Sequence, residues 1–302
     1  MKIVFIGAGA IGGYYGGQLA KAGHDITYVV REETRKVIDA EGLTLINPEG
    51  TETITNISTV ASLDEVEHAD VVISAIKIFG EPSLPEKLPA GAVFMTTENS
   101  VEYPMLAQEK YGSENLIPAV ARAFIHREGP ATAHHMGGVL ALSFGSVDPV
   151  TEPVVQALKE ALDQTPITAK VHPAILHDVW MKAMMVTCFG VLGAVMEQPI
   201  DILRTQYRES LRALMAEAAD TARAAGIELK EDAVDKVMHF TDQQPEGATA
   251  SMQRDILEGL PSELDSQVGG IVRVAQRSNT TAPLHQLVWE TLRVKSEKLR
   301  GA

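Results

Sequence analysis

The pattern of apolar and polar positions divides the chain into two halves of different character. In the first half, short apolar runs separated by polar or acidic stretches predict strands. They cover residues 3–6, 25–30, 43–46, 53–57, 71–76, 93–96, 116–121 and 139–144. Helical spacing over residues 14–22, ended by Gly23, links the first two strands as a βαβ unit requires. Residues 129–144, with glycines at 137, 138 and 145, predict an antiparallel hairpin at the sheet edge.

Long helical patterns replace the strands from Pro173 onward. The predicted helices cover residues 174–196, 208–225, 231–241, 261–278 and 283–299. A last short strand within residues 166–173 leads into them. We therefore predict an α/β fold with an N-terminal Rossmann-type doubly wound sheet over residues 1–168. An all-helical C-terminal domain over residues 169–302 follows it.

The turn between the first strand and the first helix carries a glycine motif, Gly7-Ala8-Gly9-Ala10-Ile11-Gly12. Gly7 allows a tight turn, Gly9 lets the backbone approach a pyrophosphate, and Gly12 lets the helix pack close to the strand. The N-terminus of the helix then faces the negative charge of the phosphates. Because a strand and a helix flank the motif, we expect all six residues to bind a dinucleotide rather than form a simple packing turn.

Arg31 ends the second predicted strand, where NAD-dependent enzymes usually carry an acidic residue for the adenosine ribose 2′-hydroxyl. A guanidinium can instead pair bidentately with a 2′-phosphate, so the sequence favours NADP(H). Two alternatives stay open. Glu32 or Glu33 faces the ribose if the strand ends one residue later, or Arg31 is simply a solvated arginine at a strand end.

Composition and charge narrow the class of protein. The chain has 302 residues, of which 45% are hydrophobic and 22% charged, and its net charge is −14. These values are ordinary for a soluble globular protein and argue against nucleic acid and anionic membranes as partners. No apolar run approaches the ~20 residues that span a bilayer, and the N-terminal strand is not a signal peptide.

The cysteine and histidine residues suggest neither a disulfide nor a metal site. Cys188 is the one cysteine, so no intramolecular disulfide forms, and a cytoplasmic location fits this composition best. We expect Cys188 to be a buried core thiol. His134 and His135 have no further ligand at metal-binding spacing, so no metal is expected.

A dinucleotide site implies hydride transfer, which also needs a proton donor. Lys182 lies in an apolar helical pattern, where desolvation favours the neutral amine and suits a general acid. The alternative is a lysine that extends from the helix surface to solvent. Ser251 and Asp255 share one face of a predicted helix. Glu263, in a predicted first helical turn, is interpreted from the residues alone as a helix-capping carboxylate.

In combination, these motifs make the chain similar to the ketopantoate reductases (2-dehydropantoate 2-reductases) over nearly its whole length. Several spaced motifs in the right order are more specific than any one of them. The resemblance rests on the glycine motif with Arg31, on Ala75-Ile76-Lys77, on Asn99 after Thr97-Glu98, on Trp180-Met181-Lys182, and on Ser251 to Asp255, which begins twelve residues before Glu263.

The resemblance implies NADPH-dependent reduction of a 2-oxo acid to a 2-hydroxy acid. It implies that Lys182 protonates the ketone oxygen, and that Glu263 orients the substrate and this lysine. By the same resemblance Ser251 and Asn99 bind the substrate. Lys77, Asn99 and Glu263 lie at the cofactor, which is NADP(H). A homodimer through the helical domain is a further expectation of the resemblance that the residues alone do not establish.

The chain departs from the family at three positions, two of which belong to the predicted pocket. Well-characterised members carry asparagines four and eight residues after the lysine, where this chain has Val186 and Gly190. The Asn-Gly of the family reads Asn99-Ser100 here. Each lost amide removes hydrogen bonds worth about 0.5–1.5 kcal/mol. We therefore expect a pocket that takes a different 2-oxo acid, bulkier or less hydroxylated than ketopantoate.

Two hypotheses that assign the chain to another functional class stay open beside the 2-oxo acid reductase. A non-catalytic NADP(H)-binding regulator would keep the nucleotide site without turnover, in line with the two replaced asparagines. An NADP-dependent dehydrogenase of a 3-hydroxy acid or sugar acid would share the architecture and a helix-borne lysine. The retained Lys182, Ser251 and Glu263 favour the 2-oxo acid reductase over both.

Overall fold

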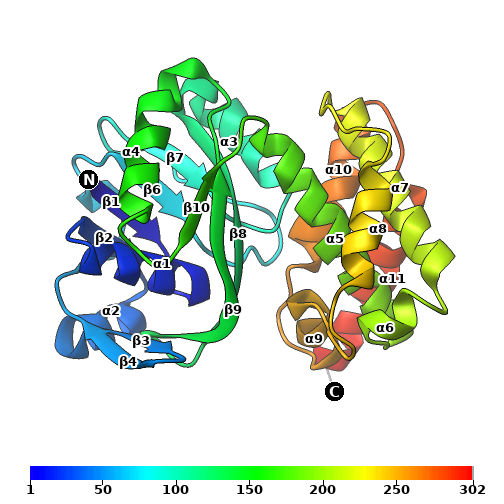
Figure 1. Cartoon of the computed structure of the whole chain (residues 1–302), viewed down its shortest axis with the longest axis horizontal. Helices are drawn as coiled ribbons and strands as arrows, with labels where there is room; N and C mark the ends of the chain where they lie inside the picture. The colour runs from blue at the N-terminus through cyan, green and yellow to red at the C-terminus, as the bar shows by residue number, and fades with distance from the viewer. Residues whose placement is uncertain (301–302) are drawn as a thin grey trace. The chain divides into compact units, whose positions relative to one another are not determined.

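The computed structural model describes the backbone of residues 1–300 and the side chains of residues 1–297, and it divides into two compact units (Figure 1). The first unit comprises Met1–Lys77, Ser83–Glu98 and Leu106–Ile175. The second comprises Ile78–Pro82, Asn99–Met105 and the chain from Leu176 onward. The predicted boundary at 168/169 falls inside a strand of the first unit, and residues 301–302 of the predicted helical domain lie outside the described residues.

The first unit is built on one sheet of ten strands. The strands are β1 (Lys2–Ile6), β2 (Asp25–Val29), β3 (Leu43–Asn47), β4 (Gly50–Ile54), β5 (Ser58–Val60), β6 (Val71–Ser74), β7 (Val93–Thr96), β8 (Leu116–Arg127), β9 (Thr132–Phe144) and β10 (Thr168–Val171). Six of them run parallel in the order β5-β2-β1-β6-β7-β8. This order confirms the predicted doubly wound sheet and reverses direction between β1 and β6, where such folds bind ligands.

The predicted edge hairpin within residues 129–144 is wrong. That segment is mostly the single long strand β9, which pairs antiparallel with β8 and parallel with β3 and β10, so it lies inside the sheet. Gly137 and Gly138 have φ values of +87° and +76° and lie where the β8–β9 register shifts. They therefore bend the strand as a bulge does, and the reversal of the chain comes earlier, between β8 and β9.

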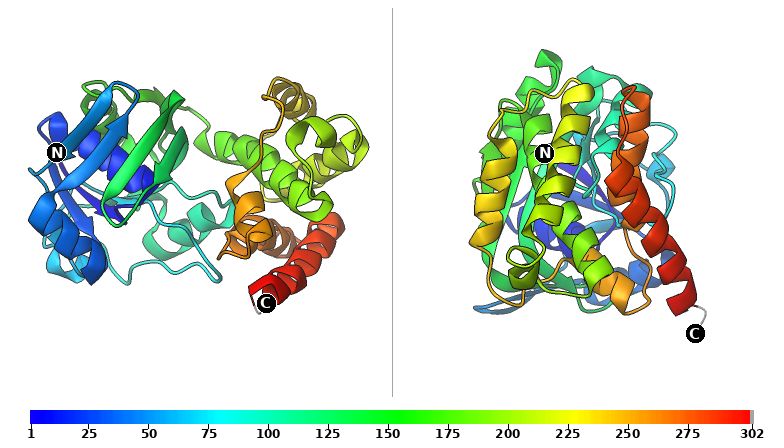
Figure 2. Two further views of the ribbon diagram at one scale, coloured as in Figure 1. Left: turned by 90° about the horizontal axis from the view of Figure 1, so that it is seen from below. Right: turned by 90° about the vertical axis from the view of Figure 1, so that its right-hand side faces the viewer.

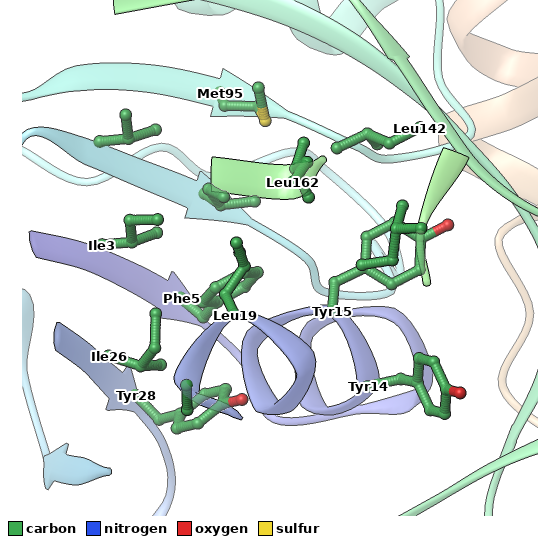
Figure 3. Packing of buried hydrophobic residues seen from close by; sticks show 14 of the residues in the cluster. Ile3, Phe5, Tyr14, Tyr15, Leu19, Ile26, Tyr28, Met95, Leu142 and Leu162 are labelled. Atoms are coloured by element: carbon green, nitrogen blue, oxygen red, sulfur yellow. The ribbon is translucent and has the colours of Figure 1, made fainter. Parts of the chain in front are cut away.

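Helix α1 (Ala10–Lys21) is buried over Gly12–Ala20 because strands from both ends of the sheet pack against it. A Cβ atom at Gly16 would lie 2.9 Å from the Phe5 ring, and one at Gly17 would lie 2.9 Å from Leu45. The absence of side chains thus lets two strands approach the helix closely. Figure 3 shows Phe5, Leu19 and Tyr28 in this core.

Three helices and three short turns occupy stretches between strands for which the sequence pattern predicted no element. The helices are α2 (Glu32–Glu41), α3 (Glu102–Tyr111) and α4 (Glu152–Leu162), and the 3₁₀ turns cover Leu63–Glu65, Ser113–Asn115 and Pro149–Thr151. Strand β4 begins and ends three residues before the predicted strand 53–57, and β5 was not predicted.

The second unit is helical, as predicted (Figure 2). Its helices are α5 (Ile175–Met196), α6 (Ile200–Leu203), α7 (Arg208–Ala224), α8 (Ala233–Asp242), α9 (Ser251–Leu257), α10 (Gly270–Arg277) and α11 (Pro283–Arg300). The predicted helix 261–278 is wrong at its start, because Pro261–Glu263 are not helical and a π-helical turn covers Asp265–Gly269. The short helix α6 was not predicted, whereas α9 is the helix that was expected to carry Ser251 and Asp255.

Helix α5 corrects the expectation that no apolar run approaches the length of a membrane span. It has 22 residues, and an 18-residue window within it has a mean hydropathy of 1.7. Of that window 67% is buried inside the fold, which is typical of the core helix of a soluble protein. Among the described helices it is the one that passes this test of length and composition.

Candidate active site

The turn after β1 has the geometry that a dinucleotide needs. Gly7 has a φ of +95°, and a Cβ atom at Gly12 would lie 2.1 Å from the carbonyl oxygen of Gly7. Both glycines are therefore required by the protein's own backbone. A Cβ atom at Gly9 would meet nothing within 4 Å, so no protein contact explains this glycine. The space beside Gly9, at an N-terminus of α1 without a side-chain cap, fits an approaching phosphate.

The turn packs on the end of β6, where the strand order of the sheet reverses. The amide of Ala75 donates to the carbonyl of Ile6 at 3.1 Å. A Cβ atom at Gly7 would lie 2.9 Å from Ile76 Cγ2. Lys77 follows directly and its side chain is exposed. The predicted cofactor residues of the first unit, the glycine turn and Lys77, thus gather at the switch point of the sheet.

Arg31 lies two residues beyond the end of β2, at the N-cap position of α2, and its side chain is exposed. The neighbouring cationic side chains already form ion pairs, Arg35 with Glu32 and Asp39, and Lys36 with Glu32. No ion pair of Arg31 occurs in the described part of the chain, and no side chain caps the first amides of α2. This arrangement leaves a guanidinium and a helix N-terminus free to meet a phosphate.

Glu98 lies just after β7, at the same edge of the sheet as the glycine turn. It was not selected as a functional candidate from the sequence. Its Oε2 atom accepts a hydrogen bond from the amide of Thr97 at 2.9 Å. Burial raises the pKa of Glu98 to about 8, against hydrogen bonds from Ser74 and backbone amides that lower it. The carboxyl group is therefore largely neutral at pH 7, so it adds little negative charge beside the nucleotide turn.

Lys182 and Asn99 come together within the second unit. Lys182 is half-buried on α5, and its Nζ atom donates a hydrogen bond to Asn99 Oδ1 at 2.6 Å. Asn99 follows β7 in sequence, but the segment Asn99–Met105 belongs to the helical unit. The sequence predicted both residues at one site. The structure adds that an amide oxygen orients the ammonium group of the lysine.

Glu263 precedes the helix rather than lying in its first turn, which corrects the sequence-based interpretation. The helix begins at Leu264, and the Glu263 carbonyl accepts from the Gln267 amide at 2.9 Å. Glu263 as a whole is 6% exposed, and its carboxylate accepts a hydrogen bond from Gln267 Nε2 at 3.4 Å. Gln267 Oε1 in turn accepts from the Thr187 hydroxyl at 3.3 Å. Glu263 is thereby linked to α5, one and a half turns beyond Lys182.

Ser251 begins α9, on the same helix as Asp255 as predicted, and its side chain is exposed. Its neighbours fill the space at Gly190. A Cβ atom at Gly190 would lie 2.9 Å from Ala250 Cβ and 3.3 Å from Met252 Cε. An asparagine at position 190 would therefore collide with the start of α9. Apolar atoms of Ala250 and Met252 thus occupy the space into which a side chain at position 190 would extend.

Cys188 is a buried core thiol, as predicted, and belongs to a buried series of polar groups. Its Sγ atom lies 3.7 Å from His285 Nε2, and His285 Nδ1 lies 2.7 Å from Glu217 Oε1. Such a series resembles an activated nucleophile. However, burial raises the pKa of the Cys188 thiol, and both Cys188 and His285 are fully buried. The series therefore serves to connect α5, α7 and α11.

The histidines of β9 take part in local contacts. His134 pairs with Glu128, and His135 stacks against Tyr14 with ring centroids 5.4 Å apart. No group of three or more His, Cys, Asp or Glu side chains suited to a metal ion occurs among the described residues.

Comparison with known proteins identifies relatives along nearly the whole chain. The family model described as ketopantoate reductase PanE/ApbA matches residues 3–149, and the model of the C-terminal part of that family matches residues 174–296. A 2-dehydropantoate 2-reductase of Caulobacter vibrioides is 26% identical, covering 95% of this chain and 96% of the relative.

Solved structures share the fold. The crystal structure of 2-dehydropantoate 2-reductase from Methylococcus capsulatus matches with a TM-score of 0.86 and 25% identity, over 99% of this chain and 98% of that one. The ternary structure of D-mandelate dehydrogenase with NADH and anilino(oxo)acetate matches with a TM-score of 0.83 and 18% identity, over 99% of this chain and 100% of that one. The second likeness is one of fold alone.

Proposed function

Because the chain belongs to the ketopantoate reductase family, an oxidoreductase family acting on CH–OH groups with a nicotinamide cofactor, we propose that it reduces a 2-oxo acid to the 2-hydroxy acid with NADPH. The observation that carries the proposal is the half-buried Lys182, whose Nζ atom is held by Asn99 at 2.6 Å. A lysine in this setting is a proton donor for a ketone oxygen. The proposed enzyme is soluble and cytoplasmic, and the homodimer expected from the resemblance stays a prediction.

Reduction of a ketone adds a hydride to carbon and a proton to oxygen. The nicotinamide, when bound, supplies the hydride to C2 of the 2-oxo acid. Lys182 Nζ releases its proton to the ketone oxygen, and Asn99 Oδ1 holds the ammonium group in orientation. Glu263, whose carboxylate accepts from Gln267, is proposed to orient the substrate and to restrain Lys182. We further propose that Ser251 contacts the substrate and that Lys77 lies at the cofactor, as the family resemblance implies.

The free guanidinium of Arg31 supports NADP(H) as the preferred cofactor. We predict that Arg31→Ala raises the Kd for NADPH by about 10- to 100-fold, because one charge-assisted bidentate contact contributes roughly 1.5–3 kcal/mol. The Kd for NADH, which lacks the 2′-phosphate, should stay the same. Fluorescence titration with both nucleotides measures the two constants. Arg35→Ala, which removes a guanidinium already paired on the same helix, is the matched control. An equal loss for NADH and NADPH would contradict the role of Arg31.

The apolar start of α9 at Gly190 supports a substrate with an apolar side chain. D-Mandelate dehydrogenase shares the fold, and its structure holds anilino(oxo)acetate, a 2-oxo acid derivative with an aromatic group. A pocket without the two family amides cannot satisfy the hydroxyl group of ketopantoate in the same way. We therefore propose a 2-oxo acid with an aliphatic or aromatic side chain as the preferred substrate.

A panel of 2-oxo acids tests this proposal through NADPH oxidation, followed by absorbance. We predict turnover, with kcat/KM about 10-fold higher for 2-oxoisocaproate or benzoylformate than for ketopantoate. Ketopantoate as the best substrate would contradict the apolar pocket. NADPH binding without oxidation by any 2-oxo acid would contradict the reductase and favour a regulatory protein. Val186→Asn, which restores one amide, should reduce the ratio of kcat/KM for these two substrates to kcat/KM for ketopantoate. Gly190→Asn should unfold at a lower temperature because its side chain meets Ala250.

A further inference from the structure

Arg273 on α10, a half-buried side chain, forms an ion pair with the buried Glu102 of the segment that carries Asn99. Its Nε atom lies 3.0 and 2.9 Å from the two carboxylate oxygens of Glu102, and Nη2 lies 2.8 Å from Oε2. Glu102 is only 2% exposed. A bidentate pair in such surroundings fixes both partners in position, since separation would leave a buried charge uncompensated.

The same guanidinium also holds the turn that follows Glu263. Its Nη1 atom lies 3.2 Å from Asp265 Oδ2, and Nη2 donates to the Asp265 carbonyl at 3.2 Å. The Trp289 ring covers the guanidinium, with its centroid 6.0 Å from Cζ. Arg273 therefore joins two segments that are far apart in sequence. A lysine has one point charge and cannot reproduce this fork.

Each of the two segments carries a residue of the candidate site. Asn99, which accepts from Lys182, stands three residues before Glu102. Glu263 stands two residues before Asp265. The Asn99 segment lies close against α10, because a Cβ atom at Gly270 would be 3.5 Å from Glu102 Cβ and 3.6 Å from Ser100 Oγ. Little freedom remains for Asn99 once Glu102 is held.

The π-helical turn itself connects to other parts of the site. The Ser266 hydroxyl donates to the Ile78 carbonyl at 3.1 Å, one residue after Lys77. Gln267 links Glu263 to Thr187 on α5. π-Helical turns occur frequently at functional sites because they reorient side chains within a helix. Asp265 begins this turn, so its contact with Arg273 fixes the end of the turn nearest Glu263.

We infer that Arg273 is a positioning residue that holds Asn99 and Glu263 in place for Lys182 through its paired contacts with Glu102 and Asp265. The inference rests on the proposed function, since it assumes that Lys182 donates the proton. A misplacement of ~1 Å at a catalytic group can cost on the order of 10²-fold in rate. Arg273 thus acts on turnover without touching the substrate.

Three variants separate positioning from general stability. Arg273→Met should lower kcat by about 10- to 100-fold and leave KM for NADPH within about twofold. Arg273→Lys, which keeps the charge without the fork, should recover part of kcat. Arg277→Met is the matched control, because Arg277 lies one turn further on α10, 4.0 Å from the same carboxylate, with 42% of its side chain exposed. Its kcat should stay within about twofold of the wild type.

Acylation of lysines in the ligand-free protein, quantified by mass spectrometry, gives a readout that needs no activity. Lys182 should react several-fold faster in Arg273→Met, because Asn99 no longer holds its ammonium group, whereas Lys295 should react as before. Unchanged Lys182 acylation and unchanged kcat in Arg273→Met would overturn the inference. If Arg273→Met yields little folded protein, Glu102→Gln carries the same test. Altered Lys182 acylation in a protein that reduces no 2-oxo acid would support the positioning and contradict the proposed function.

Discussion

Lys182→Ala is expected to lower kcat by on the order of 10²-fold or more while NADPH still binds. General acid catalysis by a positioned side chain contributes about 10²- to 10⁴-fold to a rate. Lys182 is the half-buried amine of the candidate site, and its Nζ atom is already oriented by Asn99. The nucleotide turn lies in the other unit, so its amides are unchanged by the substitution. Steady-state rates and NADPH titration measure the two effects separately.

Lys295→Ala is the matched control for this prediction. Lys295 is also a partly buried lysine of the helical unit, and its Nζ atom bonds Glu197 at 2.7 Å and the Ala194 carbonyl at 3.3 Å. Its loss should change thermal stability about as much as the loss of Lys182, yet leave kcat unaltered. Near-normal turnover in Lys182→Ala would remove this lysine from the mechanism. An equal loss of kcat in both variants would assign the effect to folding.

Gly12→Ala is expected to abolish measurable NADPH binding, and Gly9→Ala to weaken it without loss of stability. A methyl group at Gly12 would lie 2.1 Å from the Gly7 carbonyl oxygen, so the turn must distort and the melting temperature must fall. A methyl group at Gly9 meets no protein atom within 4 Å, and the φ of −80° there is open to any residue. It would occupy the space through which the pyrophosphate approaches the backbone.

Thermal unfolding and NADPH titration of these two glycine variants together distinguish packing from binding. We predict that Gly9→Ala keeps the wild-type melting temperature and raises the Kd for NADPH by about 10-fold. Gly12→Ala should lose both stability and binding. Wild-type affinity in Gly9→Ala would show that the phosphates do not bind at this turn.

The parallel strands and the glycine turn of the first unit were largely predictable because their sequence signals are local. Continuous apolar runs mark buried parallel strands, and the glycine motif follows from the backbone clash at Gly12. The position of β9 was not predictable from such signals. Gly137 and Gly138 are typical of a turn, but in the structure they bend a strand whose partners β3, β8 and β10 are distant in sequence. Pairing with these distant strands decides between a turn and a bent strand at Gly137 and Gly138.

The candidate site was predictable as a set of residue types but not as an arrangement. Lys182 and Asn99 were expected at one site. Their hydrogen bond forms because residues 99–105 belong to the helical unit, which the sequence does not show. Arg273 gave no local signal, because a charged residue at a helical position usually lies at the surface. Gln267 stands four residues after Glu263, so the predicted helix 261–278 already placed both side chains on one face.

We propose that this chain delivers a hydride from NADPH to C2 of a 2-oxo acid and a proton from Lys182 to the oxygen. The measurement uses NADPH that carries deuterium in both positions at C4 of the nicotinamide with a mixture of 2-oxo acids, and detects the products by mass spectrometry. We predict a 2-hydroxy acid that carries one deuterium at C2 with the wild-type chain, and on the order of 10²-fold less of it with Lys182→Ala. Bound NADPH that yields no deuterated 2-hydroxy acid would contradict it.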